Sequence, residues 1–165
     1  MRIEIHSATA QDTREVGEAL ASLLHEGDAI ALTGELGAGK TTFVQGLARG
    51  LQIDDPIVSP TFTLIREYRG RLHLVHVDVY RLERVQDVID LGLDDEVSDG
   101  ALLVVEWGDA VQALLPPDHL TIEMTVPTTD VERRLIVLSG DGPSWHARWE
   151  RLESALVRWA SGSAA

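Results

Sequence analysis

Cysteine is absent from this 165-residue sequence, which excludes disulfides, thiolate chemistry and cysteine-based metal sites. No apolar run approaches the roughly 20 residues that a helix needs to cross a bilayer, so no membrane span is expected. Residues 1–6 predict a short strand and lack the apolar core of a signal peptide. These absences favour a cytoplasmic protein.

Basic residues are also scarce, because 14 Lys and Arg stand against 27 Asp and Glu, for a net charge of −13. Tight binding to nucleic acid needs clustered basic side chains that release phosphate counterions. Any role on nucleic acid is therefore expected to depend on a partner or on a local basic patch. Lys40 is the only lysine in the chain, which draws attention to its surroundings.

The hydrophobic pattern predicts an α/β protein with a mixed sheet. An amphipathic helix is expected at 8–24, capped by Ser7 or Thr9, and a second helix at 41–51. Residues 84–97 predict a helix interrupted at Gly92, and a short helix precedes the Pro116–Pro117 pair. Buried strands are expected at 29–33 and 101–107, and antiparallel hairpins at 62–68 with 72–77 and at 120–126 with 132–138.

Residues 34–41, with the sequence GELGAGKT, match the phosphate-binding pattern G-x-x-x-x-G-K-S/T. The glycines let backbone N–H groups turn inward, Lys40 reaches the β- and γ-phosphates, and the Thr41 hydroxyl is a Mg²⁺ ligand. An apolar strand precedes the loop and a helix follows it, as the motif requires. A chance match around a single lysine is on the order of one in a thousand, so nucleotide binding and a P-loop NTPase-like three-layer fold are expected.

Two predicted strands end in an acidic residue, as a Mg²⁺-dependent P-loop site requires. Glu106 follows four aliphatic residues and fits the metal ligand better, whereas Asp78 fits a residue that orients water or supports the metal shell. A solvated turn is the alternative for each. Thr61 is placed to sense the γ-phosphate, and a simple turn that opens a strand explains it equally well.

The histidines and the tryptophans of the last helix indicate a metal site or a partner surface less clearly. The six histidines lack zinc-site spacing, so structural or surface roles are expected for them. The last helix places Trp145, Trp149 and Trp159 on one face. We expect this 143–165 segment to pack on the domain formed by residues 1–142, with a partner-binding stripe as the alternative.

The motifs at 34–42, 59–64, 76–82 and 105–107 together resemble the bacterial TsaE (YjeE) family, over about residues 8 to 140. The resemblance implies a Mg²⁺-dependent ATPase of low intrinsic activity. It implies a need for this ATPase in threonylcarbamoylation of the adenosine next to the anticodon, in tRNAs that read codons starting with A. The partner would be a complex of TsaD and TsaB, which would hold the tRNA. Val79 and Gly108 depart from the residues that the family often has.

The resemblance also implies a set of site residues. Catalytic roles fall on Lys40, Thr61, Asp78 and Glu106, and Mg²⁺ on Thr41 and Glu106. ATP contacts fall on Leu36, Gly37, Ala38, Gly39, Lys40, Thr41, Thr42, Trp107 and Arg133. Adenine contacts are expected from residues 10–13 and Arg133, and Tyr80 and Arg81 would support Asp78 or contact a partner.

Three other functions compete with this interpretation. A small-molecule kinase shares the loop, but it needs a lid arginine and an acceptor pocket, and Arg133–Arg134 is the only adjacent basic pair. A GTPase is disfavoured because its N-K-x-D motif needs a second lysine. A scaffold gated by nucleotide binding, without a need for hydrolysis, stays open.

Overall fold

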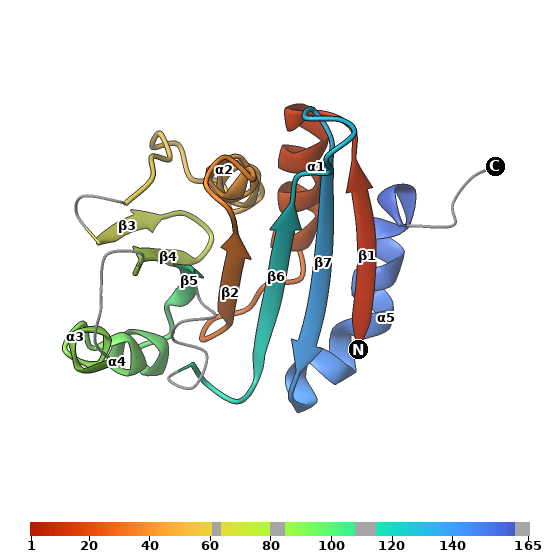
Figure 1. Cartoon of the computed structure of the whole chain (residues 1–165). Coiled ribbons are helices and arrows are strands. Elements are labelled where there is room, and N and C mark those ends of the chain that lie inside the picture. Colours follow the sequence, from red (N-terminus) through yellow and green to blue (C-terminus); the bar gives the residue numbers. More distant parts are fainter. Residues whose placement is uncertain (61–63, 80–84, 108–114, 161–165) are drawn as a thin grey trace.

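The computed structural model describes residues 1–60, 64–79, 85–107 and 115–160. A seven-stranded sheet forms the centre of the molecule, with helices packed on it (Figure 1). The strands are β1 (Arg2–Ser7), β2 (Ala29–Gly34), β3 (Ile65–Arg69), β4 (His73–Asp78), β5 (Leu102–Glu106), β6 (His119–Thr125) and β7 (Arg134–Asp141). The helices are α1 (Ala10–Ala21), α2 (Lys40–Gly50), α3 (Val85–Ile89), α4 (Leu93–Ser98) and α5 (Pro143–Leu156), followed by the 3₁₀ turn η2 (Val157–Trp159).

The strand order is β1-β7-β6-β2-β5-β4-β3. The four central strands β6, β2, β5 and β4 run parallel, whereas β3–β4, β6–β7 and β7–β1 are antiparallel. The expected mixed sheet with antiparallel hairpins is therefore confirmed. The expected helix within 84–97 is two short helices that meet at Gly92, and the helix predicted before Pro116 lies outside the described residues.

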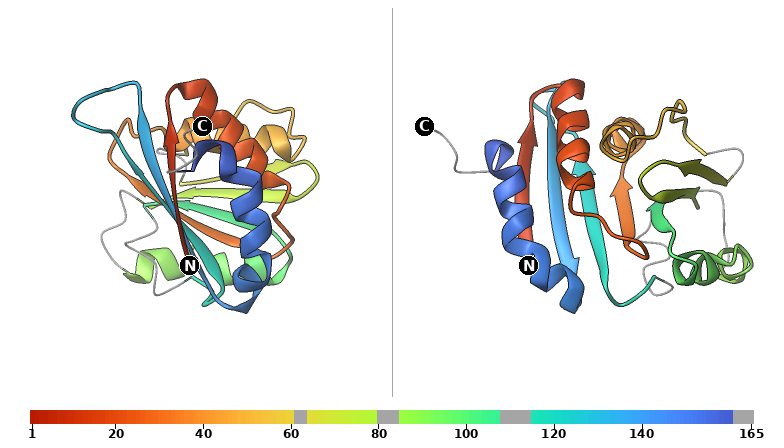
Figure 2. Two further views of the ribbon diagram at one scale, coloured as in Figure 1. Left: turned by 90° about the vertical axis from the view of Figure 1, so that its right-hand side faces the viewer. Right: turned by 180° about the vertical axis from the view of Figure 1, so that it is seen from behind.

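The two faces of the sheet carry separate apolar cores. Helices α1, α2 and α5 cover one face (Figure 2). On the other face, Val88 of α3 and Leu93 of α4 pack on β2, β4 and β5. Along β5, Leu102 and Val104 face the first core and Leu103 faces the second, so every residue of this strand is buried. Burial on both sides explains why its sequence is a continuous aliphatic run.

The period of two along a strand also places the acidic residues. Glu106 continues the alternation of Leu102 and Val104, and Asp78 continues that of Leu74 and His76. Both carboxyl groups therefore lie on the face that α2 covers, at the carboxyl ends of their strands. In parallel sheets ligands bind at this edge.

Helix α5 is part of the main core. Trp145 and Trp149 are buried, and Trp159 packs partly buried against the same core. Arg148 donates to both carboxylate oxygens of Asp28, at 2.7 and 2.8 Å, and so connects α5 to the residue before β2. These tryptophans therefore contribute to the apolar core of the sheet, and the division of the chain at residue 142 stays a prediction.

Candidate nucleotide-binding site

The loop between β2 and α2 opens a cavity at the carboxyl edge of the sheet. Gly39 is the N-cap residue of α2 with φ 99°, a left-handed conformation that favours glycine. No side chain caps the helix there, so the amide groups of its first turn remain available at the positive end of the helix dipole. A helix N-terminus of this kind is suited to bind phosphate.

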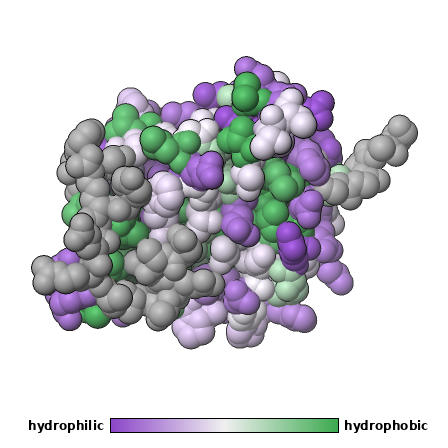
Figure 3. All heavy atoms as spheres, in the orientation of Figure 1, coloured by the Kyte–Doolittle hydropathy of each residue, from purple (hydrophilic) through white to green (hydrophobic). Residues whose placement is uncertain are grey.

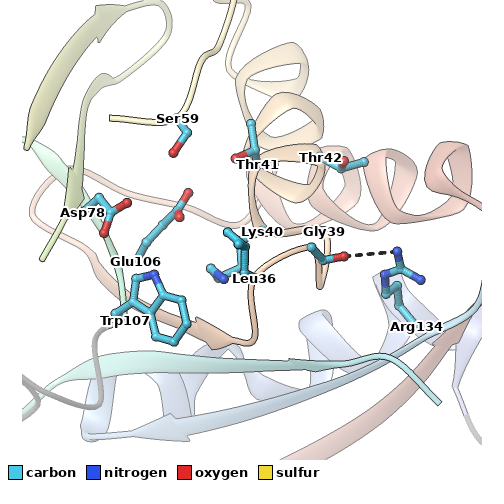
Figure 4. A pocket seen from close by; sticks show the side chains of 11 residues that line it. Leu36, Gly39, Lys40, Thr41, Thr42, Ser59, Asp78, Glu106, Trp107 and Arg134 are labelled. Carbon is cyan, nitrogen blue, oxygen red and sulfur yellow. Dashed lines mark hydrogen bonds between the residues drawn. The ribbon is translucent and has the colours of Figure 1, made fainter. Parts of the chain in front are cut away.

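The cavity has a volume of about 560 Å³, and side chains from segments far apart in the sequence gather around it (Figure 4). Its lining brings together Lys40 and Thr41 with Asp78, Glu106 and Trp107. The described residues that line it are Leu36, Gly37, Gly39, Lys40, Thr41, Thr42, Ser59, Asp78, Glu106, Trp107 and Arg134.

Asp78 and Glu106 are neighbours in the register of the parallel strands β4 and β5. They are only 4% and 3% exposed, and their carboxyl groups point into the space between the loop and Ser59 (Figure 4). Within the described ranges, no three His, Cys, Asp or Glu residues group together in a way that could hold a metal ion. A Mg²⁺ ion here would therefore draw further ligands from Thr41, phosphate and water, which matches its usual coordination.

The Lys40 ammonium is held by neutral acceptors. Its Nζ donates to the carbonyl oxygens of Gly34, at 2.7 Å, and Glu35, at 3.1 Å, and lies 4.3 Å from the ring centroid of Trp107. Burial lowers the pKa of Lys40, and the carboxylates of Glu106 and Asp78 oppose this shift. Phosphate oxygens carry charge and would be stronger acceptors for this group.

Trp107 directly follows Glu106 and has φ 64°, an uncommon conformation for a bulky residue. Its backbone N–H donates to the carbonyl oxygen of Leu32 at 2.7 Å, and this hydrogen bond stabilises the backbone conformation. Strained residues of this kind gather at functional sites. Here the strained turn keeps the indole ring against Lys40.

His76 is a residue of the site that sequence reasoning left out. It is fully buried, and its Nε2 lies 2.9 Å from Oε1 of Glu106. The two atoms share a hydrogen bond, in which Nε2 is the donor when Glu106 is ionised, because a carboxylate oxygen can only accept. Its position in the sequence could have indicated this role, because His76 stands two residues before Asp78 and therefore lies on the same face of β4.

Arg134 is a second residue that the sequence analysis did not select. Its guanidinium donates to the loop carbonyl oxygens of Ala38, at 2.9 Å, and Gly37, at 3.3 Å, and it lines the cavity. Arg133 does not line the cavity; its side chain is 64% exposed and pairs with Asp130 at 3.1 Å.

The remaining expected site residues differ in whether they line a cavity. Ala38 is buried and does not line the cavity. Ala10 and Thr13 line a smaller cavity of about 120 Å³, which shares Arg134 with the larger one. Thr61, Tyr80 and Arg81 lie outside the described residues.

Comparison with known families identifies the chain. The sequence model of the family described as "Threonylcarbamoyl adenosine biosynthesis protein TsaE" matches residues 7–135. The chain belongs to the TsaE family. The resemblance predicted from the four motifs is therefore confirmed, and membership in this family counts against the kinase alternative.

Two relatives named "tRNA threonylcarbamoyladenosine biosynthesis protein TsaE" show how far the similarity extends. The protein of Treponema pallidum is 48% identical over 120 residues, which cover 73% of this chain and 89% of the relative. The protein of Streptomyces coelicolor is 42% identical over 138 residues, covering 80% and 93%.

A solved structure supports the fold of this TsaE-family chain. The crystal structure of YdiB from Bacillus subtilis superimposes with a TM-score of 0.78 at 33% sequence identity and covers 96% of this chain and 95% of YdiB. The expected P-loop NTPase-like α/β fold is confirmed. In the part of the chain that the structure describes, every helix is too short or too polar to span a membrane.

Proposed function

We propose that this protein is the ATP-binding and ATP-hydrolysing accessory protein of tRNA threonylcarbamoylation. It acts in the cytoplasm on a complex of TsaB and TsaD. This complex modifies the adenosine next to the anticodon in tRNAs that read codons starting with A. The observation that carries the proposal is one cavity that joins a P-loop to the paired carboxylates of Asp78 and Glu106. The net charge of −13 agrees with a protein that reaches tRNA only through partners.

The chain's own groups divide the work on ATP. The amides of residues 36 to 42 hold the phosphates, and Lys40 supplies positive charge to the β- and γ-phosphates. Thr41 and Glu106 would hold Mg²⁺, which when bound neutralises charge on the phosphates. Asp78 orients the attacking water, and Trp107 closes one wall beside the nucleotide. Thr61 stays a prediction for γ-phosphate sensing.

The contacts of Lys40 support a low intrinsic activity. Before this ammonium can reach a phosphate, it must exchange the carbonyl oxygens of Gly34 and Glu35 and the ring of Trp107 for phosphate oxygens. A partner that favours the exchange would raise turnover, because a group already in place for the transition state costs no rearrangement.

Glu106→Gln tests the proposed function. Loss of the carboxylate charge is expected to lower ATP turnover about 100-fold, with a smaller effect on ATP affinity, because the phosphate loop is intact. We would measure turnover and the threonylcarbamoyladenosine content of tRNA with the TsaB–TsaD complex, and use Glu150→Gln, an exposed position on α5, as the control. If tRNA modification continued through repeated cycles with Glu106→Gln, hydrolysis would not be required, and the protein would act as a scaffold gated by nucleotide binding.

Arg134→Ala is expected to weaken ATP binding about 10-fold, because it removes charged hydrogen bonds, worth about 1.5–3 kcal/mol each, that hold the loop rather than the nucleotide, so only part of this free energy affects ATP binding. Arg133→Ala is the matched control and should change the affinity little, since its partner Asp130 lies outside the cavity lining. Calorimetry with ATP and Mg²⁺ measures both. A larger loss for Arg133→Ala than for Arg134→Ala would contradict the placement of the two side chains.

A further inference from the structure

A second cavity, of about 310 Å³, shares Trp107 with the nucleotide cavity. The second cavity opens where β2 and β6 end, and the described residues that line it are Thr33, Gly34, Glu35, Trp107, Glu123, Met124, Thr125 and Val126. None of the proposed catalytic carboxylates lines it.

This cavity borders β6, beyond the part of the sheet on which the described residues of α3 and α4 pack. Along β6, Glu123 and Thr125 are exposed and alternate with the buried Ile122 and Met124, so they point away from the face that α1 and α2 cover. Among the described residues, the core under α3 and α4 includes side chains of β2, β4 and β5 but none of β6. Figure 1 shows β6, β7 and β1 in front of α1 and α5, and Figure 3 shows polar and apolar side chains mixed on this face.

The second cavity is connected to the nucleotide cavity through Lys40. The Lys40 ammonium donates to the carbonyl oxygens of Gly34 and Glu35, and its third contact is the Trp107 ring. All three residues line the second cavity. A group that enters this cavity therefore meets the residues that hold the P-loop lysine.

The charge of the second cavity points to a cation. Its described lining residues include the acids Glu35 and Glu123, two threonines and an indole, and none of these residues is a lysine or an arginine. An indole face attracts a guanidinium or ammonium group, and carboxylates form charge-assisted hydrogen bonds with both. An anion or a purely apolar segment has no such match here.

We propose that this second cavity receives an arginine or lysine side chain of the protein partner, and that its entry drives the Lys40 ammonium toward the phosphates. The proposal rests on the proposed function, because it requires both a partner and bound ATP. Two cations beside Trp107 and Glu35 repel each other, and the phosphate oxygens of bound ATP offer charged acceptors to the Lys40 ammonium in the nucleotide cavity, which Lys40 also lines. Partner docking thus becomes a stimulus for ATP turnover.

Glu123→Lys tests the proposal in the full chain. The added ammonium is expected to lower the affinity for the TsaB–TsaD complex at least 10-fold, and Glu123→Gln is expected to lower it less. ATP affinity of the isolated protein should stay unchanged, since Glu123 does not line the nucleotide cavity. Glu150→Lys on α5 carries the same change in net charge and is the control for long-range electrostatics. Thermal melts report whether each variant is folded.

Three results distinguish the ideas. Reduced partner affinity and reduced stimulation for Glu123→Lys, with normal ATP binding, supports the proposal. Partner affinity and stimulation equal to those of Glu150→Lys overturns it and leaves the proposed function standing. If the unaltered protein binds no ATP or no TsaB–TsaD complex, the proposed function fails and the second-cavity proposal fails with it.

Discussion

Lys40→Ala is expected to lower ATP affinity by about 100- to 1,000-fold and to abolish measurable turnover. The chain has no second lysine, and within the described part of the cavity lining the only other cationic side chain is Arg134, whose guanidinium is bonded to the loop carbonyl oxygens. Without the ammonium, the carboxylates of Asp78 and Glu106 face the triphosphate with less opposing charge. This range corresponds to about 2.7–4.1 kcal/mol, which matches two lost charged hydrogen bonds at the lower end of about 1.5–3 kcal/mol each.

Lys40→Arg is the matched variant for this prediction. It keeps the positive charge, but its planar fork differs in shape from the compact ammonium, so an intermediate affinity is expected. Calorimetric titration with ATP and Mg²⁺ measures the series, and thermal melts control for folding. Equal ATP affinity in Lys40→Ala and the unaltered protein would show that the loop does not grip the phosphates.

Gly46→Ala is expected to lower the free energy of unfolding by about 3 kcal/mol or more, at the upper end for added atoms in a packed core. A Cβ at this position would lie 1.9 Å from the carbonyl oxygen of Arg14 in α1, and this neighbour is backbone that cannot turn aside. Gly17 has a similar contact, 2.4 Å from the carbonyl oxygen of Phe43. The helices α1 and α2 therefore touch along their backbones.

This prediction has the opposite sign to helix propensity, which alone favours alanine over glycine by about 1 kcal/mol. Urea denaturation measures the free energy of unfolding, and Arg49→Ala, an exposed position on the same helix, is the control. Because α2 begins at Lys40, displaced helices should also weaken ATP binding. Higher stability in Gly46→Ala would show that α1 and α2 lie farther apart than described.

Residues with a local signature could be placed from the sequence. The glycines and Lys40 follow a spacing whose geometry is local to one loop, and Glu106 ends a strand whose aliphatic run shows burial on both faces. The period of two then places Asp78 and Glu106 on one side of the sheet. The roles of these residues in binding and hydrolysis stay predictions until they are measured.

Residues whose role depends on tertiary contacts could not be placed in this way. Arg133 and Arg134 are adjacent, and only the start of β7 at Arg134 decides which guanidinium reaches the loop. His76 has no motif of its own, and its contact with Glu106 arises because β4 and β5 pair in one particular register. The left-handed backbone of Trp107 also lacks a sequence signal, since glycine usually takes this conformation.

A calorimetric titration of the purified protein with ATP in the presence of Mg²⁺ tests the central claim most directly. We expect saturable heat with one nucleotide bound per chain, and loss of that heat in Lys40→Ala. Absence of heat in the unaltered protein, or the same binding isotherm in both proteins, would contradict a triphosphate site at this loop.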